Sequence, residues 1–521
     1  MFYTSISKAV RLSLAAALIA GVVLVFHSTP IVRAATITVT TTTDDVAVNG
    51  NCTLREAIIA ANLDHAEDAC PAGNGADTIV LPAGTYVLSI PGPGENAATT
   101  GDLDITEDLS LQGAGKTSTL IYGNGLDRVF DINKSAQISD VTISGGDSGT
   151  ESGGGIRVTG ALTLTNSRVT DNVSGAGGGG IDVYSTSSRL TAIETRIYSN
   201  TAAYDGGGIY NYGTTTLLNS LVSGNKASNG GGISSQTTLV LVNSTISGND
   251  GGVTGGGLKI VGTTDLYNVT ITDNKASQGG GVNVVTAATL NARNSIIADN
   301  IDSGASIPDP DCSGTFIGQG YNLIGDTSGC TIIGTTGNVT GVSANLGPLQ
   351  NNGGPTLTHA LQASSPAIDA GNPSGCVDPN GLVLVTDQRG FARPIDGDGN
   401  GTARCDMGAF ERLSPGAPTP TNTATSTNTP TSTSTRTPSA TPTRTATATA
   451  TNTTTSTPTS TSTATITHTP TATPTNTPGP SPTHTSTPTV TPTCLPGPDL
   501  GCTPTPTPTL GYRVYLPIIQ K

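Results

Sequence analysis

The chain has 521 residues, a formal net charge of −14 and only 12% charged residues. Its 67 glycines and its lack of tryptophan are typical of short strands joined by tight turns, and they argue against a mainly helical protein. An acidic surface repels phosphate groups, so nucleic acid and anionic lipid are not expected as partners.

Residues 1–34 have the features of a secretory signal peptide. Lys8 and Arg11 precede an apolar run over residues 12–26, and residues 32–34 offer a small-residue cleavage site. The run is too short for a comfortable membrane span, which favours a cleaved signal over an uncleaved anchor. Cleavage removes three basic side chains and no acidic one, so the net charge falls from −14 to −17. We therefore expect an exported protein with no transmembrane span after cleavage.

The stretch "CTLREAIIAANLDHAE", residues 52–67, predicts an amphipathic helix. Thr53 and Glu56 have the spacing of a capping box at its start. The stretch resembles the CSLREA segment that opens many bacterial β-helix proteins, with Thr53 in place of its Ser, an exchange that keeps the N-cap chemistry. This resemblance implies a position rather than an activity, namely a cover over the open end of a β-helix.

A repeat of 24 to 28 residues follows. The residues that open its copies are Asp140, Asn166, Glu194, Asn219, Asn243, Asn268 and Asn294. Three positions later stands an inward Val or Ile: Ile143, Val169, Ile197, Val222, Ile246, Ile271 and Ile297. Six positions later, six consecutive copies carry Asn: Asn172, Asn200, Asn225, Asn249, Asn274 and Asn300. A second apolar column follows a glycine cluster: Ile156, Ile181, Ile209, Ile233, Leu258 and Val282.

A short period that fixes only columns of side chains is typical of a stacked solenoid. Alternating runs such as "ALTLTNSRVT" predict strands, and the apolar columns are expected to stack inside. The Asn column is expected to form a ladder in which each amide bonds to the next coil. Thr245, beside the inward Ile246, is expected to face outward. The "SGNxAxxGGGI" form resembles the right-handed parallel β-helix of pectin-lyase-like proteins and the repeats of polymorphic bacterial surface proteins.

After residue 344 the period is lost. "NLGPLQNNGGPTLTHAL", "SSPAIDAG", "TDQRGFARP" and "CDMGAFE" resemble the landmarks of the choice-of-anchor Q domain, a family that stands just before bacterial surface anchors. Met407 replaces its usual aliphatic residue. Residues 413–510 consist almost only of Thr, Pro, Ser, Ala and Asn, a composition that cannot bury enough apolar surface to fold. The final "YRVYLPIIQK" resembles a short terminal motif of some bacterial secreted and surface proteins.

The expected fold is therefore all-β, a right-handed parallel β-helix with a helical N-terminal cap, a small C-terminal domain and a disordered Thr/Pro stalk. Its parts are the signal peptide 1–34, the cap 35–78, the β-helix 79–344, the choice-of-anchor Q-like domain 345–412, the stalk 413–510 and an anchoring-type motif 511–521.

The eight cysteines fall into local pairs, and export favours their oxidation to disulfides. The expected pairs are Cys52–Cys70, Cys312–Cys330, Cys376–Cys405 and Cys494–Cys502. Locality selects these four from the 105 pairings that eight cysteines allow.

Tyrosines gather in two coils, and their faces and hydroxyl groups are suited to stacking on sugars and bonding to them. The candidate ligand-binding residues are Tyr184, Tyr198, Tyr204, Tyr210 and Tyr212. The alternative is that they are ordinary outward residues of a sheet, where aromatic side chains are common.

One loop has the spacing of a metal site. In "DGDGNG", Asp396, Asp398 and Asn400 alternate before Gly401, as in the first half of a calcium loop. The position of the closing bidentate Glu is taken by Met407, so a plain Asp/Gly turn is the alternative. No cofactor other than Ca²⁺ is expected.

The resemblance to pectin-lyase-like proteins implies two kinds of enzyme, lyases with a carboxylate cluster for calcium and hydrolases with Asp groups on neighbouring coils. Fold alone does not confer either activity. In the repeats, Asp171, Asp273 and Asp299 share one column, but Ser or Gly interrupts it, so no stacked acidic group is expected. The sequence therefore favours a secreted, bacterial cell-surface protein, adhesin-like or envelope-structural, non-catalytic, and binding a glycan or an envelope component. The alternative is a carbohydrate-active enzyme of the lyase or hydrolase kind.

Overall fold

The computed structural model describes residues 34–304 and 308–414, all of which lie in the first of two units, Met1–Asn428. The expected signal peptide, most of the stalk, the terminal motif and the Cys494–Cys502 pair lie outside the described residues. Within the described ranges, no helix is long and apolar enough to cross a membrane.

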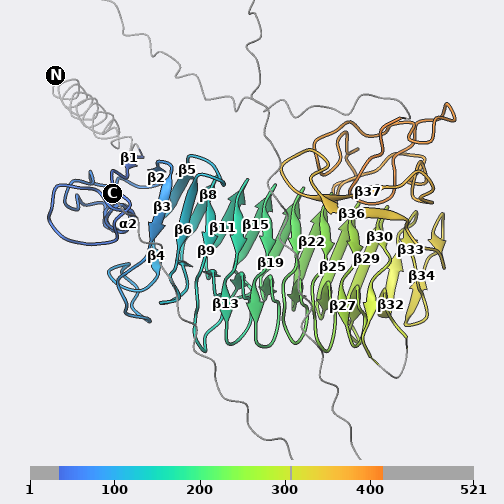
Figure 1. Cartoon of the computed structure of the whole chain (residues 1–521), viewed down its shortest axis with the longest axis horizontal. Coiled ribbons are helices and arrows are strands. Elements are labelled where there is room, and N and C mark those ends of the chain that lie inside the picture. The colour runs from blue at the N-terminus through green and yellow to red at the C-terminus, as the bar shows by residue number, and fades with distance from the viewer. Residues whose placement is uncertain (1–33, 305–307, 415–521) are drawn as a thin grey trace, which may run out of the picture. The chain divides into compact units, whose positions relative to one another are not determined.

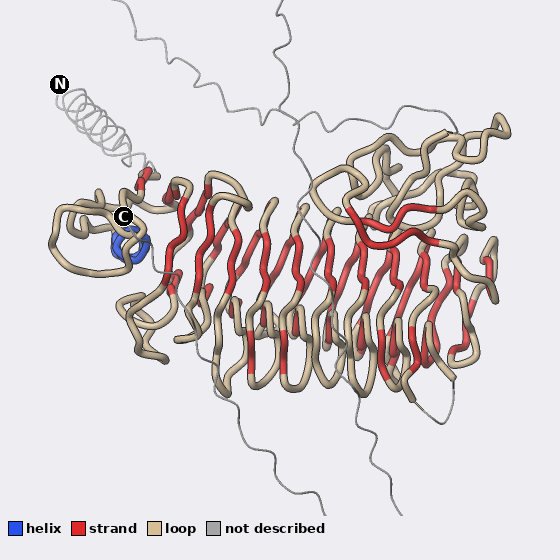
Figure 2. Tube along the Cα trace, in the orientation of Figure 1, coloured by secondary structure: helices blue, strands red, loops and turns tan. Residues whose placement is uncertain are grey.

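The described chain is a solenoid of parallel strands closed at its N-terminal end by one helix (Figures 1 and 2). That helix, α2 (Leu54–Leu63), begins after Thr53, whose side chain accepts from the backbone N–H of Glu56 while the Glu56 side chain accepts from the backbone N–H of Thr53. The predicted capping box is therefore present. The helix is more deeply buried than an amphipathic pattern suggests, since every residue from Leu54 to Ala61 is buried.

Each coil contributes one short strand to each of three faces. The strands of the β4–β32 face are β4 (Leu103–Ile105), β7 (Phe130–Ile132), β10 (Ile156–Val158), β14 (Ile181–Val183), β18 (Ile209–Asn211), β21 (Ile233–Ser235), β24 (Leu258–Ile260), β28 (Val282–Val284) and β32 (Cys312–Gly318).

The strands of the β1–β34 face are β1 (Thr36–Thr38), β2 (Asp77–Leu81), β5 (Leu109–Gly113), β8 (Ser135–Ser139), β11 (Ala161–Thr165), β15 (Arg189–Ile193), β19 (Thr214–Leu218), β22 (Thr238–Val242), β25 (Thr263–Tyr267), β29 (Thr289–Arg293), the shared β32, and β34 (Cys330–Ile333). Because β32 pairs with both β28 and β29, these two faces form one 20-stranded sheet.

The β3–β35 face is an 11-stranded sheet of β3 (Gly84–Val87), β6 (Thr119–Tyr122), β9 (Thr142–Ser144), β12 (Arg168–Thr170), β16 (Arg196–Tyr198), β20 (Leu221–Ser223), β23 (Thr245–Ser247), β26 (Thr270–Thr272), β30 (Ile296–Ile297), β33 (Leu323–Ile324) and β35 (Val339–Thr340). Three two-stranded pairs complete the described strands: β13 (Val173–Ser174) with β17 (Thr201–Ala202), β27 (Lys275–Ala276) with β31 (Ile301–Asp302), and β36 (Leu346–Gln350) with β37 (Thr358–Leu361).

The predicted columns are confirmed by the strand register. Ile156, Ile181, Ile209, Ile233, Leu258 and Val282 stack in consecutive pairings of the β4–β32 face. On the β3–β35 face the column from Ile143 to Ile297 stacks in the same way. All of these side chains are buried, so each coil completes the core of its neighbours.

The Asn column forms the expected ladder at an inner corner. Each side-chain Nδ2 donates to the Oδ1 of the next Asn, from Asn172 to Asn300, at 2.8–3.0 Å. The last amide, that of Asn300, donates to Asp311 Oδ1. Each Oδ1 also accepts a backbone N–H of the preceding coil, so the buried amides are satisfied on both sides.

The residues that open the repeat copies sit at another corner and have positive φ angles of 44–60°. The left-handed conformation is least unfavourable for Asn and Asp among residues with a Cβ atom, which accounts for their frequency in this column. Three of the predicted disulfides are present: Cys52–Cys70, Cys312–Cys330 and Cys376–Cys405.

Residues 345–414 form a region with little regular structure apart from the antiparallel β36–β37 hairpin, and they pack on the β3–β35 face (Figure 2). Thr245 of β23 donates from Oγ1 to Gln388 Oε1 at 2.6 Å and is 0% exposed. The expectation that Thr245 faces solvent was therefore wrong. The strand register places it outward from the solenoid, but the C-terminal region covers that part of the face.

Candidate ligand-binding site

The outward side chains of the β4–β32 face form a single row along the solenoid. Each three-residue strand turns its first and third residues into the core, so its middle residue faces out. The pairings align these middle residues in the order Asp104, Asp131, Arg157, Asp182, Tyr210, Ser234, Lys259 and Asn283. We call this the outer row. Its N-terminal residues are charged, and Tyr210 stands near its middle.

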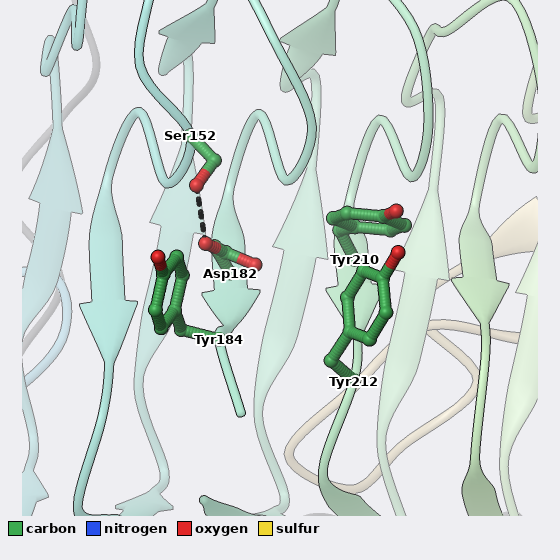
Figure 3. A pocket seen from close by; sticks show the side chains of 5 residues that line it. All are labelled: Ser152, Asp182, Tyr184, Tyr210 and Tyr212. Carbon is green, nitrogen blue, oxygen red and sulfur yellow. Dashed lines mark hydrogen bonds between the residues drawn. The ribbon is translucent and has the colours of Figure 1, made fainter. Parts of the chain in front are cut away.

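A pocket of about 260 Å³ opens at the middle of the outer row and is lined by Ser152, Asp182, Tyr184, Tyr210 and Tyr212 (Figure 3). Asp182 and Tyr210 belong to the paired strands β14 and β18. Tyr184 and Tyr212 follow the ends of those strands, and Ser152 comes from the turn before β10. Three turns and two strands therefore supply the lining.

The tyrosines of the pocket present faces at different angles. Tyr210 and Tyr212 lie edge to face, with ring centroids 5.0 Å apart and an interplanar angle of 84°. The guanidinium of Arg157 lies over the Tyr184 ring, 4.2 Å from its centroid. Tyr184 and Tyr212 keep 51% and 41% of their surface exposed, so part of each ring is free to contact a ligand.

The structure brings together three of the five candidate tyrosines. Tyr198 lies on β16 of the β3–β35 face, where it stacks with Arg196 at 4.8 Å. Tyr204 lies in the turn before β18, is 64% exposed and does not line the pocket. Proximity in sequence therefore grouped residues that the coil separates onto different faces.

Asp182 is the acidic group of the pocket. The residue is 1% exposed, and its carboxylate accepts a hydrogen bond from Ser152 Oγ. Burial raises the pKa of Asp182 to about 6, although the Ser152 hydroxyl and the charge of Arg157 oppose that shift. Burial also raises the pKa of Tyr210, and its neighbour Tyr212 adds to the effect, so Tyr210 keeps its phenolic proton at neutral pH.

A second group of carboxylates lies at the N-terminal end of the outer row. Asp102, Asp104 and Asp131 each offer a ligand oxygen within 4.8 Å of the others, and all three are buried. The expectation that no acidic groups stack concerned the repeats only, and Asp104 and Asp131, which are register partners on β4 and β7, precede them. No repeat relates the two positions, because the first regular copy opens at Asp140. The alternating "DLD" at residues 102–104 was the available signal.

The predicted calcium loop is an internally hydrogen-bonded turn. Asp396 accepts from the backbone N–H groups of Gly399, Asn400 and Gly401. Asp398 accepts from the backbone N–H of Asn400. Asp369, not considered from the sequence, comes within 4.8 Å of Asp396 and Asp398. The turn geometry is explained without an ion, and calcium binding here stays a prediction.

Another pocket, of about 390 Å³, contains His359 together with Asp273 and Asp299. His359 contacts Gly347 O through Nδ1 at 2.7 Å and Ser247 Oγ through Nε2 at 2.8 Å. Burial lowers the pKa of His359, so the ring is neutral at pH 7. With both nitrogens engaged, this histidine ties the hairpin β36–β37 to β23 and is poorly placed for proton transfer.

Comparison with known proteins bears on the fold. A family described as the right handed beta helix region matches residues 128–297. The crystal structure of pectate lyase Pel9A is similar at 16% identity and a TM-score of 0.35, covering 71% of this chain and 96% of that one. No curated protein gave a significant match. The family match and the observed parallel sheets identify the solenoid as a right-handed parallel β-helix. The CSLREA-like and choice-of-anchor Q-like assignments stay predictions.

Proposed function

We propose that this protein is an exported, cell-surface β-helix protein, adhesin-like or envelope-structural, that binds a glycan without cleaving it. The observation that carries the proposal is the pocket that Tyr184, Tyr210 and Tyr212 line at the middle of the outer row. Partly exposed tyrosines on a scaffold that cannot rearrange are suited to stacking on sugar rings.

The size and polarity of the pocket support a glycan over an apolar ligand. At about 260 Å³ it is just below the range of about 300–1,000 Å³ usual for small-molecule sites. That size suits one ring of a longer chain running over the surface. Asp182, Ser152 and the tyrosine hydroxyls provide hydrogen-bonding groups at the pocket, which a ring of hydroxyl groups can use.

The position of the pocket fits a binding face. Its strands are held to the neighbouring coils by the packing of the Ile column beneath them and by the hydrogen bonds of the Asn ladder at the corner. Side chains on such strands lose little freedom when a ligand arrives, which favours affinity. A long solenoid also presents the pocket at a fixed place along an extended surface.

The alternative, a carbohydrate-active enzyme, is favoured by one specific observation. Asp182 and Asp205 both act electrostatically on Tyr210, and the pKa of Asp182 is raised to about 6. A carboxyl group whose pKa is raised toward neutral pH is what a general acid requires. Asp205, however, is already paired with Lys259 at 2.9 Å and accepts from Ser234, so it is held as a structural partner.

The experiment that tests the proposal is a screen of the full-length secreted chain against a glycan array and against polysaccharides. Binding should be weakened at least tenfold by Tyr184→Ala and by Tyr212→Ala, whereas the matched control Tyr204→Ala should bind like the wild type. No release of reducing or unsaturated sugar ends is expected. Release of such ends that Asp182→Asn abolishes would establish the enzyme instead, and unchanged binding in both pocket variants would refute the proposed site.

Attachment to the cell surface is a separate part of the proposal. It rests on the order of a signal peptide, a folded head, a Thr/Pro stalk and the apolar residues 511–521 in the sequence. Deleting residues 511–521 should release the protein from washed cells into the medium without changing its melting temperature. Full-length protein already free in the medium would contradict anchoring.

A further inference from the structure

The acidic cluster at the N-terminal end of the outer row is built from neighbouring coils. Asp102 precedes β4, Asp104 is its middle residue, and Asp131 is the middle residue of β7. These residues are only 2%, 0% and 4% exposed. Three carboxylates are thus held side by side away from solvent, within 4.8 Å of one another.

The protein satisfies these carboxylates only in part: Asp104 Oδ2 accepts from the backbone N–H of Ala98 at 2.9 Å. Asp102 Oδ2, Asp104 Oδ1 and Asp131 Oδ1 have no hydrogen-bond donor among the described residues. Arg128 Nη1 lies 3.5 Å from Asp102 and 3.7 Å from Asp131, and Arg157 Nη1 lies 3.9 Å from Asp131. These separations exceed the 2.7–2.9 Å usual for a charge-assisted hydrogen bond. Asp104 has no Lys or Arg partner within 4.0 Å in the described chain.

Asp102 and Asp131 have only distant Arg counter-charges, and Asp104 has one donor and no cation partner. Buried carboxylates that are paired so incompletely destabilise a fold unless something neutralises them. Even with Arg128 and Arg157 beside them, the three carboxylates keep a net negative charge, which a bound divalent cation would neutralise. We propose that Asp102, Asp104 and Asp131 bind a structural divalent cation, with calcium as the occupant that their chemistry fits.

The donor set decides which cation. The cluster contains no His or Cys, the ligands that zinc and copper sites use. Carboxylate oxygens suit calcium, which also tolerates an irregular shell completed by backbone carbonyls. Magnesium demands nearly ideal octahedral geometry and keeps several waters, for which a cluster buried to 96% or more leaves little room.

The cap helix holds the backbone on which the cluster is built. Arg55 of α2 donates to the carbonyl oxygens of Ala98, Gly101 and Asp102. Asn62 of the same helix donates to Asp104 O at 2.7 Å. A cation at this place would therefore join the first two coils directly beneath the cap. Because the carboxylates are buried, the ion would be structural and would not contact a ligand in the tyrosine pocket.

The test uses the full-length secreted protein, stripped with EGTA and then titrated with CaCl₂. We expect one tightly bound calcium per chain by calorimetry and a rise of several degrees in melting temperature, because an ion that binds only the folded state stabilises it. Asp104→Asn and Asp131→Asn should each abolish this rise. The matched control, Asp396→Asn with Asp398→Asn in the exposed turn, should keep it.

Three results would overturn the proposal. One is an unchanged melting temperature of the wild type in calcium, which would mean that protons and not a cation neutralise the cluster. Another is loss of the rise in the control pair together with its retention in Asp104→Asn, which would place the site in the turn. The third applies if Asp104→Asn and Asp131→Asn fail to fold. Elemental analysis of the purified control pair should then find one calcium per chain, and absence of calcium would refute the site.

Discussion

Two stacks of buried polar side chains run between coils of this β-helix, and they differ in whether their members satisfy one another's hydrogen bonds. In the Asn ladder each amide both donates and accepts, so Asn200, Asn225 and Asn249 satisfy one another through the core corner. In the acidic cluster the stacked groups are carboxylates, which only accept, and three of their oxygens have no donor. The same stacking therefore leaves no unsatisfied atoms when the side chain carries both a donor and an acceptor, as Asn does. It leaves unsatisfied oxygens, and a need for a counter-charge, when the side chain only accepts, as Asp does.

The largest loss of stability is expected when a carboxylate is placed in the core, where neither a hydrogen-bond partner nor an ion can reach it. Ile246 lies in the inward column between Val222 and Ile271 and is 0% exposed. Ile246→Asp should lower the free energy of unfolding by more than about 4 kcal/mol. Val253→Asp, at a position that is 57% exposed, should change it by less than about 1 kcal/mol. Equal melting temperatures for the two variants would refute the assigned inward column.

A smaller loss of stability is expected when one amide of the Asn ladder is replaced by a carboxylate, as in the acidic cluster. Asn225 Nδ2 donates to Asn249 Oδ1 and to Ile197 O. Asn225→Asp keeps the shape but replaces that donor by an acceptor, so three oxygens would face one another. We expect a loss of about 3 kcal/mol in urea unfolding at pH 7. Recovery of most of that loss at pH 3, where a carboxyl group can carry a donor proton, would sharpen the explanation; no recovery would contradict it.

Asp182 is an intermediate case, because Ser152 supplies one donor. Its folded-state pKa of about 6 exceeds the ordinary 3.8, so the folded form binds the proton more tightly than the unfolded form. The stability this provides is complete below about pH 4 and is lost as the pH rises through 6. Subtracting the curve of Asp182→Asn from that of the wild type should isolate a decline of about 2 kcal/mol between pH 4 and 7. Parallel curves would show that Asp182 does not titrate there.

The smallest effect is expected from giving the acidic cluster a donor. In EGTA, Asp104→Asn should raise the free energy of unfolding by about 1 kcal/mol, because it removes one buried charge and adds an N–H group beside unsatisfied oxygens. In the same buffer Asp326→Asn, in the turn after β33, serves as a carboxylate control and should change little. A marked destabilisation by Asp104→Asn in EGTA would show that the negative charge itself is needed without any ion.

Repetition decides how much of this molecule could be predicted from its sequence. The Ile and Asn columns were predicted because each position recurs in six or seven copies, and each copy tests the others. The capping box was predicted because it is a local pattern of side chain and backbone. Both kinds of inference need only neighbouring coils or neighbouring residues.

What was missed involves contacts made once. Thr245 is covered by Gln388, a residue 143 positions away, and no period relates the two. The pocket takes Ser152 from a turn and leaves out Tyr198, because the number of residues between strands decides which face a side chain reaches. Asp104 and Asp131 pair across the first, irregular coils, where no repeat could align them. These are tertiary contacts with no local signature.

The Asn ladder also has a direction, since every Nδ2 donates toward the C-terminal coil and the last one ends on Asp311. Such a column closes only at its end, and every rung before that is interchangeable. Whole coils of 24 to 28 residues that the C-terminal region does not contact could therefore be gained or lost in evolution without disturbing the ladder. Each such event would change the reach of the solenoid by about 4.8 Å, one strand spacing. The number of repeat copies therefore sets the distance between the cap and the C-terminal region, in steps of one coil.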